Sequence, residues 1–203
     1  MHAKLKLAPA LLALFALALP ATAQANQTLS VEKTGNGSGK VTSSPAGISC
    51  DPTCSFSFAD NTVVLLTGTP ASGSAPVVWS GCETVTAEKK CKVTMSAAKT
   101  VKATFDLIKR QLKVERKGTG TGTVTSLPAG INCGQTCSAE YDNGTEVTLS
   151  ATSGANTEAV KWAGCTSIVE GKCKVTMSMA KTVTATFALQ RHQLSVSRGG
   201  GGT

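Results

Sequence analysis

Cysteine is the residue type whose number and spacing promise the most chemistry. The eight cysteines form two sets of four, and in each set a pair separated by three residues precedes a pair separated by seven or eight. Such pairs can form disulfides, or their thiolates can hold a tetrahedral zinc ion. Four cysteines allow three disulfide pairings. We expect the local ones, which are Cys50 with Cys54, Cys82 with Cys91, Cys133 with Cys137, and Cys165 with Cys173.

The zinc alternative fits this spacing less well. Neither kind of pair forms the tight knuckle that holds structural zinc in a small domain. An exported chain also meets an oxidising environment, which favours disulfides. We therefore expect oxidised cysteines, and no metal or other cofactor.

Histidine is too scarce for a catalytic triad in either half of the chain. The two histidines are His2, near the start, and His192, near the end. Because neither lies within one of the cysteine-bearing halves, a Ser-His-Asp or Cys-His arrangement cannot be assembled there. We interpret His192 as a solvated linker residue.

Paired carboxylates are the other route to hydrolysis. When the two halves are matched, most acidic positions change type, as Glu83 does when it becomes Thr166. Such variation is typical of charged surface residues that have no catalytic role. The acidic residues that keep an acidic counterpart are Glu32 with Glu115 and Glu88 with Glu170. We expect no enzyme.

A lysine pattern around the later cysteines is the candidate ligand face. Lys90 and Lys92 match Lys172 and Lys174, and the alternation around the intervening cysteine sends each pair outward. Such a face could bind a polyanion or a glycan, or could serve only solubility and edge protection. Few aromatic residues interleave with these charges, so nucleic acid is not an expected partner. The partner stays unknown, and we expect a monomer.

Two further motifs have a chemical and a structural interpretation. The glycine-rich segments 35–39 and 118–122 could cradle a phosphate, but a strand and not a helix follows each. They predict hairpin turns instead. Trp79 and Trp162 could stack on a sugar, but a lone tryptophan beside a disulfide is more typical of a core.

The elements that position these residues belong to an internal repeat. Residues 29–105 align with residues 112–187 at an offset of 83, which becomes 82 after a one-residue deletion between the last two cysteines. VTSSPAGISC at 41–50 matches VTSLPAGINC at 124–133, and KCKVTMSAAKTVKATF at 90–105 matches KCKVTMSMAKTVTATF at 172–187. Two copies of one small domain follow from this match.

Each copy is predicted to be all-β. Val147, Leu149 and Ala151 share one face of a strand, and Val183 and Ala185 share a face of another. No stretch after the start of the chain has a sustained helical period. About 80 residues with few aromatics bury a modest core, which cross-links would supplement. The fold class is therefore two tandem, small, disulfide-stapled β-domains.

The chain divides into four segments. Residues 1–25 have the basic start, apolar run and small-residue end of a cleaved signal peptide. This predicts a secreted protein, which is periplasmic, on the cell surface or extracellular. Residues 26–107 and 108–190 are the two repeats, and residues 191–203 are the start of a third repeat or a terminal tail. The connectors 106–111 and 188–193 are equally short, which favours a semi-rigid string of modules.

The ordered motifs also carry a resemblance. The glycines before VTS, then PAGI, C-x-x-x-C, W-x-G-C, C-x-V-T-M and K-T-V-x-A-T-F resemble the divergent internalin-type B-repeat, a bacterial repeat domain. The resemblance covers nearly all of the chain after residue 25. It implies a β-grasp-like fold with one short helix, whereas the residues themselves predict no helix. It also implies a non-catalytic surface or spacer role and brings no catalytic residues.

Two functions are consistent with these observations. The repeats could be structural spacers or stalk segments of a bacterial surface or secreted protein. Alternatively, they could be adhesive modules that bind a polyanion or glycan through the lysine face.

Overall fold

Alternating apolar and polar residues form strands along nearly all of the described chain. The computed structural model describes residues 25–51, 54–197 and 199–200, and this part contains strands but no helix. The predicted all-β class is confirmed. The expected signal peptide lies almost entirely outside the described residues. Within them, no helix has the length and apolar character that crossing a membrane requires.

The first repeat is a sandwich of two sheets. Among its described residues, four strands form one sheet in the order β4-β1-β9-β6, and five form the other in the order β3-β2-β5-β8-β7. The strands are β1 (Asn26–Thr34), β2 (Gly39–Ser44), β3 (Ser49–Cys50), β4 (Ser55–Ala59), β5 (Val63–Pro70), β6 (Val78–Ser80), β7 (Thr84–Val85), β8 (Cys91–Thr94) and β9 (Lys99–Thr104).

The second repeat has the same plan. Its four-stranded sheet has the order β13-β10-β18-β15, and its five-stranded sheet the order β12-β11-β14-β17-β16. The strands are β10 (Lys109–Lys117), β11 (Gly122–Leu127), β12 (Asn132–Cys133), β13 (Ser138–Asp142), β14 (Glu146–Ser153), β15 (Lys161–Ala163), β16 (Ser167–Val169), β17 (Lys172–Thr176) and β18 (Lys181–Thr186).

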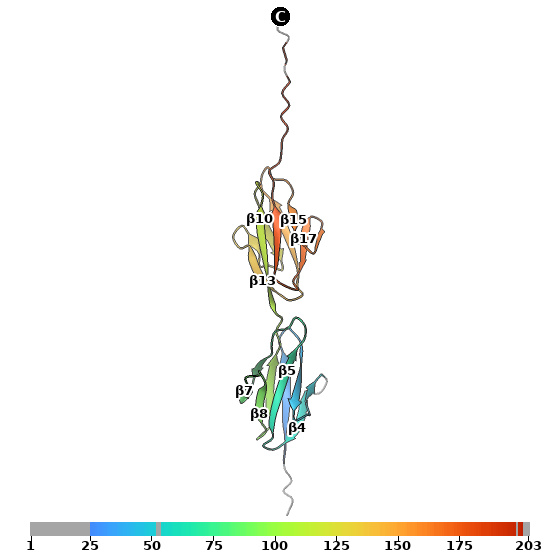
Figure 1. Ribbon diagram of the computed structural model, residues 1–203, viewed down its shortest axis with the longest axis vertical. Coiled ribbons are helices and arrows are strands. Elements are labelled where there is room, and N and C mark those ends of the chain that lie inside the picture. Colours follow the sequence, from blue (N-terminus) through green and yellow to red (C-terminus); the bar gives the residue numbers. More distant parts are fainter. Residues whose placement is uncertain (1–24, 52–53, 198, 201–203) are drawn as a thin grey trace, which may run out of the picture.

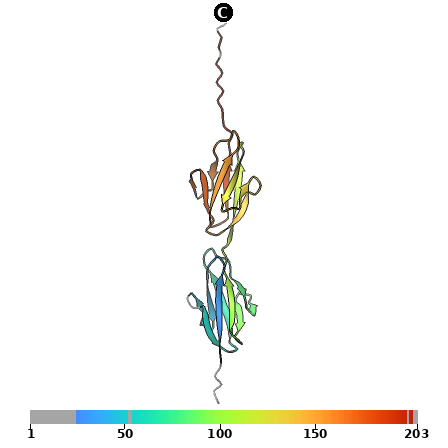
Figure 2. The same ribbon diagram turned by 180° about the vertical axis from the view of Figure 1, so that it is seen from behind.

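The first and last strands of each repeat lie side by side and run in the same direction. β1 pairs in parallel with β9 from Leu29 opposite Lys99 to Thr34 opposite Thr104, and β10 pairs in parallel with β18 in the matching register. The other strand pairs in the named sheets of the described chain are antiparallel. The chain therefore enters a repeat at one end and leaves at the opposite end, and the two sandwiches follow one another along a common axis (Figures 1 and 2).

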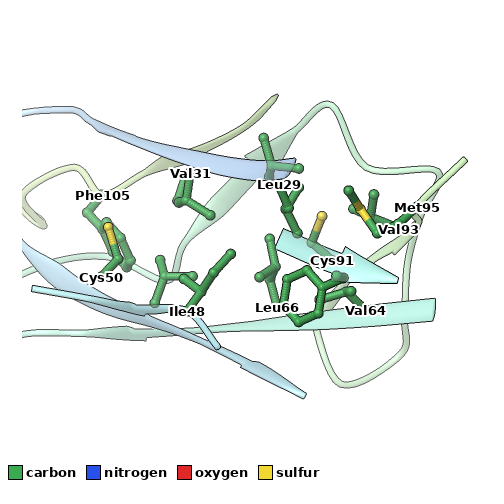
Figure 3. Close-up of a cluster of buried hydrophobic side chains, with 14 residues drawn as sticks. Leu29, Val31, Ile48, Cys50, Val64, Leu66, Cys91, Val93, Met95 and Phe105 are labelled. Atoms are coloured by element: carbon green, nitrogen blue, oxygen red, sulfur yellow. The ribbon is translucent and has the colours of Figure 1, made fainter. Parts of the chain in front are cut away.

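The core of each repeat lies between its two sheets. In the first repeat, Leu29 and Val31 of the four-stranded sheet face Val64 and Leu66 of the five-stranded sheet (Figure 3). Phe105 follows β9 and is also buried. In the second repeat, the predicted inward residues are confirmed, because Val147, Leu149, Val183 and Ala185 are fully buried and Ala151 packs against them.

The hairpin predicted at the glycine-rich segments is wrong. β1 belongs to the four-stranded sheet and β2 to the five-stranded sheet, so segment 35–38 carries the chain from one sheet to the other. The glycines are needed for close approach. A Cβ at Gly35 would meet the carbonyl oxygen of Phe105, and a Cβ at Gly39 would meet the Phe105 ring. Gly118 and Gly122 have the same relation to Phe187.

The helix of a β-grasp-like fold is not found in the described residues. The chain between β1 and β9 contains all the strands of the second sheet, and this sheet covers the apolar face that a helix would cover in a β-grasp. The alternation in the sequence predicted the disulfide-stapled all-β domain, and the structure adds that its strands form a two-sheet sandwich.

We predict that Gly122→Ala lowers the free energy of unfolding of the second repeat by about 1–3 kcal/mol, because the new methyl group overlaps the Phe187 ring. Gly134→Ala is the matched control, since its Cβ would meet only the Thr123 methyl group, at 3.5 Å. Denaturant unfolding of both variants measures the difference. Equal midpoints would show that the contact between Gly122 and Phe187 does not constrain the fold.

Candidate functional site

The disulfides connect the two sheets of each sandwich along both sides. Cys50 lies in β3 of the five-stranded sheet and is bonded to Cys54, which immediately precedes β4 of the four-stranded sheet. On the other side, Cys82 follows β6 and is bonded to Cys91 at the start of β8. The Cα–Cα distances are 4.2 and 5.4 Å. One staple therefore lies at each side of the sandwich, where its edge strands would otherwise be free to separate.

The second repeat has equivalent staples. Cys133 is bonded to Cys137, with a Cα–Cα distance of 4.2 Å, and Cys165 to Cys173, with a distance of 5.5 Å. Cys133 and Cys173 are fully buried. These are the local pairs that the sequence favoured, and no free cysteine lies in the described part of the chain.

Each tryptophan anchors the longer disulfide loop. The Trp79 indole Nε1 donates a hydrogen bond to the carbonyl oxygen of Lys89 (2.9 Å), and the Trp162 Nε1 donates one to that of Gly171 (2.8 Å). Both acceptors have a positive φ. Each ring is half-buried and packs against the core. This position supports the structural interpretation of the tryptophans over sugar stacking.

Glu83 and Thr166 differ in charge but have the same structural role. The Glu83 carboxylate accepts hydrogen bonds from the Thr94 backbone N–H (3.0 Å) and from Lys99 Nζ (2.7 Å). The Thr166 hydroxyl accepts one from the Thr176 N–H (3.1 Å), at the matching place. The Lys99 ammonium, followed by the Thr94 groups, lowers the pKa of Glu83 to about 2. The residue type changes at this position, but in both repeats its side chain accepts a hydrogen bond from a backbone N–H.

The lysines of the candidate ligand face flank the buried cysteine of β8 or β17. Lys92 and Lys172 are exposed, whereas Lys90 and Lys174 are half-buried. Lys174 forms an ion pair with Glu146 (2.9 Å), for which the first repeat has Val63 at the matching position. The two faces therefore differ in charge.

The remaining acidic candidates are not gathered into a site. Glu32 lies 3.7 Å from Lys102, and Glu115 lies 3.0 Å from Lys113 and 3.8 Å from Lys117. Within the described residues, no group of three or more histidine, cysteine, aspartate or glutamate side chains is arranged to hold a metal ion. His192 lies in the exposed segment after the second repeat.

The joint between the repeats is a network that the sequence did not predict. The Asn36 side chain of the first repeat accepts a hydrogen bond from the Leu107 N–H (2.9 Å) and donates one to Asp142 Oδ2 in the second repeat (2.9 Å). Asp142 also forms an ion pair with Lys109 (2.6 Å) and raises the pKa of that lysine. Asn36 thus ties the connector and the second repeat to one loop of the first.

The connector backbone completes this joint. The Ile108 N–H donates to the carbonyl oxygen of Gly73 in the first repeat (2.9 Å), and the Ile108 carbonyl accepts from the Asn143 N–H in the second (2.8 Å). A side chain at Gly73 would collide with the Asn143 amide. One residue is therefore bonded to both repeats, which restricts rotation between them.

A matched comparison of the repeats could not find this joint. Asn36 aligns with Thr119, and Asp142 aligns with Ala59. The joint is formed by the end of the first sandwich where the chain leaves it and the end of the second where the chain enters. The residues at these two ends need not be the same in both repeats. The sequence feature that indicated an ordered joint was the equal length of the connectors 106–111 and 188–193.

We predict that replacing Cys82 and Cys91 together with alanine lowers the free energy of unfolding by about 3 kcal/mol, because the bond closes a loop of ten residues. The matched change at Cys50 and Cys54, which closes five residues, costs about 2 kcal/mol. Chemical unfolding of the oxidised variants measures both. If neither variant is destabilised, the staples do not limit separation of the sheets.

We predict that the Glu83 carboxyl titrates near pH 2 in the folded protein. Because this pKa lies below its ordinary value of 4.5, the associated stability is present above pH 4.5 and is lost as the pH falls through about 2. Carbon-detected NMR titration gives the midpoint. Lys99→Met removes the largest cause and should raise it. An unchanged midpoint in that variant would contradict the role of Lys99.

Comparison with known proteins relates this geometry to a family. The model of the divergent InlB B-repeat domain matches residues 29–109 and 112–191. No curated protein matches the chain.

Among solved structures, the chain is similar to the Bacillus anthracis TIE protein, with 10% identity and a TM-score of 0.40. That match covers 81% of this chain and 34% of the other, so this chain spans about a third of the TIE protein's length. A minor pilin of Streptococcus agalactiae has 8% identity, a TM-score of 0.29, and coverage of 85% and 100%. A shaft pilin of Lactobacillus rhamnosus has 10% identity, a TM-score of 0.27, and coverage of 83% and 100%. The two family matches cover most of the sequence, and the chain belongs to the divergent InlB B-repeat domain family.

Proposed function

We propose that this chain is a non-catalytic spacer of a bacterial cell-surface or secreted protein. The observation that carries the proposal is the parallel pairing of the first and last strands in each repeat. Because the chain leaves a repeat at the end opposite to its entry, each repeat adds length. An antiparallel pair would return the chain to the end at which it entered.

Hydrogen bonds to the connectors support a regular end-to-end arrangement of the repeats. After the first repeat, the Ala75 N–H donates to the carbonyl of Asp106 (2.7 Å). After the second, the Glu158 N–H donates to the carbonyl of Ala188 (2.8 Å), and the Gln190 N–H donates to that of Asn156 (2.8 Å). The chain is therefore held in the same way where it leaves each repeat.

The four disulfides support a location outside the cytoplasm. Disulfides of this kind persist in oxidising compartments and are rare where thiols are kept reduced. A stapled sandwich also resists local opening, which suits a module that is exposed to proteases. These properties agree with a surface or extracellular module.

Adhesion to a polyanion through Lys90, Lys92, Lys172 and Lys174 has weaker support. The face contributes only two lysines in each repeat, and Glu146 neutralises Lys174. Surface charge of this size serves solubility, and β8 and β17 are internal strands, so these lysines do not guard a sheet edge. The spacer role uses features that both repeats share, and it is the better supported function.

We predict that molecular length grows linearly with the number of repeats. A chain carrying residues 26–190 twice in succession, with Thr119→Asn in the first copy and Ala59→Asp in the second so that the middle joint has matching residues, should gain roughly 40 Å per added repeat in small-angle X-ray scattering, since β1 and the connector are extended along the axis. The double variant Asn36→Ala, Asp142→Ala keeps both sandwiches and should show a broader spread of lengths. A maximum dimension that does not increase would contradict the spacer function.

A further inference from the structure

We propose that each repeat bears tension through its parallel ladder of terminal strands, β1 with β9 and β10 with β18. The inference rests on the proposed function only for the origin of the tension, because a spacer that is anchored at one end and pulled at the other is stretched. The mechanical property itself follows from the strand pairing alone.

The load path runs through the ladder. Tension on the chain pulls β1 at its amino end and β9 at its carboxyl end. These ends lie at opposite ends of the ladder, since Leu29 is opposite Lys99 and Thr34 is opposite Thr104. Separating the strands therefore requires them to slide past each other, which loads all the hydrogen bonds of the ladder together. In an antiparallel pair the same pull would open the bonds one after another.

The glycine-rich segment extends the ladder beyond β9. The Phe105 N–H donates to the carbonyl of Thr34 (2.9 Å), and the Gly37 N–H donates to the carbonyl of Phe105 (2.8 Å). Gly35 has a φ of +95°, and a side chain there would collide with the Phe105 carbonyl. The segment that was predicted to be a hairpin thus prolongs the region that must be sheared.

The second repeat has the same extension. The Phe187 N–H donates to the carbonyl of Lys117 (2.8 Å), and the Gly120 N–H donates to that of Phe187 (2.8 Å). Two repeats with different surface charges therefore keep the same contacts at the same end of the ladder.

Burial protects the inner face of the ladder from water. Leu29 and Val101, from the two strands, are fully buried, and so is Ala103. These side chains keep water from the inner face of the ladder, while the outer face, which includes Glu32 and Lys102, is exposed. The ladder is also internal to its sheet, since β4 pairs with the outer side of β1 and β6 with the outer side of β9.

The disulfides lie outside the load path. All four are formed by residues that lie between the terminal strands of a repeat, and none joins β1 to β9 or β10 to β18. They therefore carry no load until the ladder breaks. After the ladder breaks, the disulfides reduce the length by which the unfolded repeat can extend.

Single-molecule stretching of the oxidised full chain in two geometries tests the proposal. Attachment at Ala25 and Ser197 shears both ladders. Attachment at Ala25 and at an azide-bearing residue in place of the exposed Ala98 pulls the neighbouring ends of β1 and β9 apart and peels the ladder. At one pulling speed, we expect the rupture force in shear to be at least twofold higher. Equal forces in the two geometries would overturn the proposal.

Reduction of the disulfides provides the second measurement. Adding a reductant should lengthen each release by roughly 3–4 nm, because the stapled loops become extensible. The shear force should remain within about 1.5-fold of its oxidised value. Loss of the force peak on reduction would show that the staples bear the load and would overturn the ladder model. The scattering test of the spacer function involves no force, so either proposal can fail while the other stands.

Discussion

The parallel pairing of the first strand with the last is the constraint on which the structure depends. Parallel neighbours cannot be joined by a tight turn and need a long crossover, which is usually a helix. Here the crossover between Thr34 and Lys99 contains a complete second sheet, together with β4 and β6 at the edges of the first. That sheet covers the apolar face of the first, so the connection that the pairing requires also supplies the other half of the core. The end-to-end arrangement of the repeats follows from this one pairing.

The disulfides have a role that the core alone cannot fill. A sandwich of about 80 residues buries a modest core, and some of its edge strands are short, since β3 and β7 each contain two residues. Each staple crosses from one sheet to the other at such a side. Cys50 and Cys91 are also buried in the core, so covalent closure and hydrophobic packing act together at these sides. The cysteine pairs are local in sequence because the chain passes from one sheet to the other between β3 and β4 and between β6 and β8.

The sequence was most informative where the two repeats agree. Matched alternation predicted the strands and the inward side chains, and the alignment of residues 29–105 with residues 112–187 predicted the repeat itself. It was misleading where tertiary contacts determine the conformation, as in segment 35–39, whose glycines serve close packing against a phenylalanine. Glu83 and Thr166 were interpreted as unrelated surface residues because only their shared acceptor function is retained. Asn36 and Asp142 were missed because they act together across a boundary and have no repeated counterpart.

The joint makes the order of the two units matter. If the second unit preceded the first, Thr119 and Ala59 would meet at the boundary in place of Asn36 and Asp142. A methyl side chain cannot accept a hydrogen bond from its neighbour, so the reversed pair would lack the amide-to-carboxylate contact that now joins them. The two repeats have nearly identical cores but different residues at the two ends that meet in a joint. Reversing their order would therefore give a joint with fewer contacts and more freedom of movement.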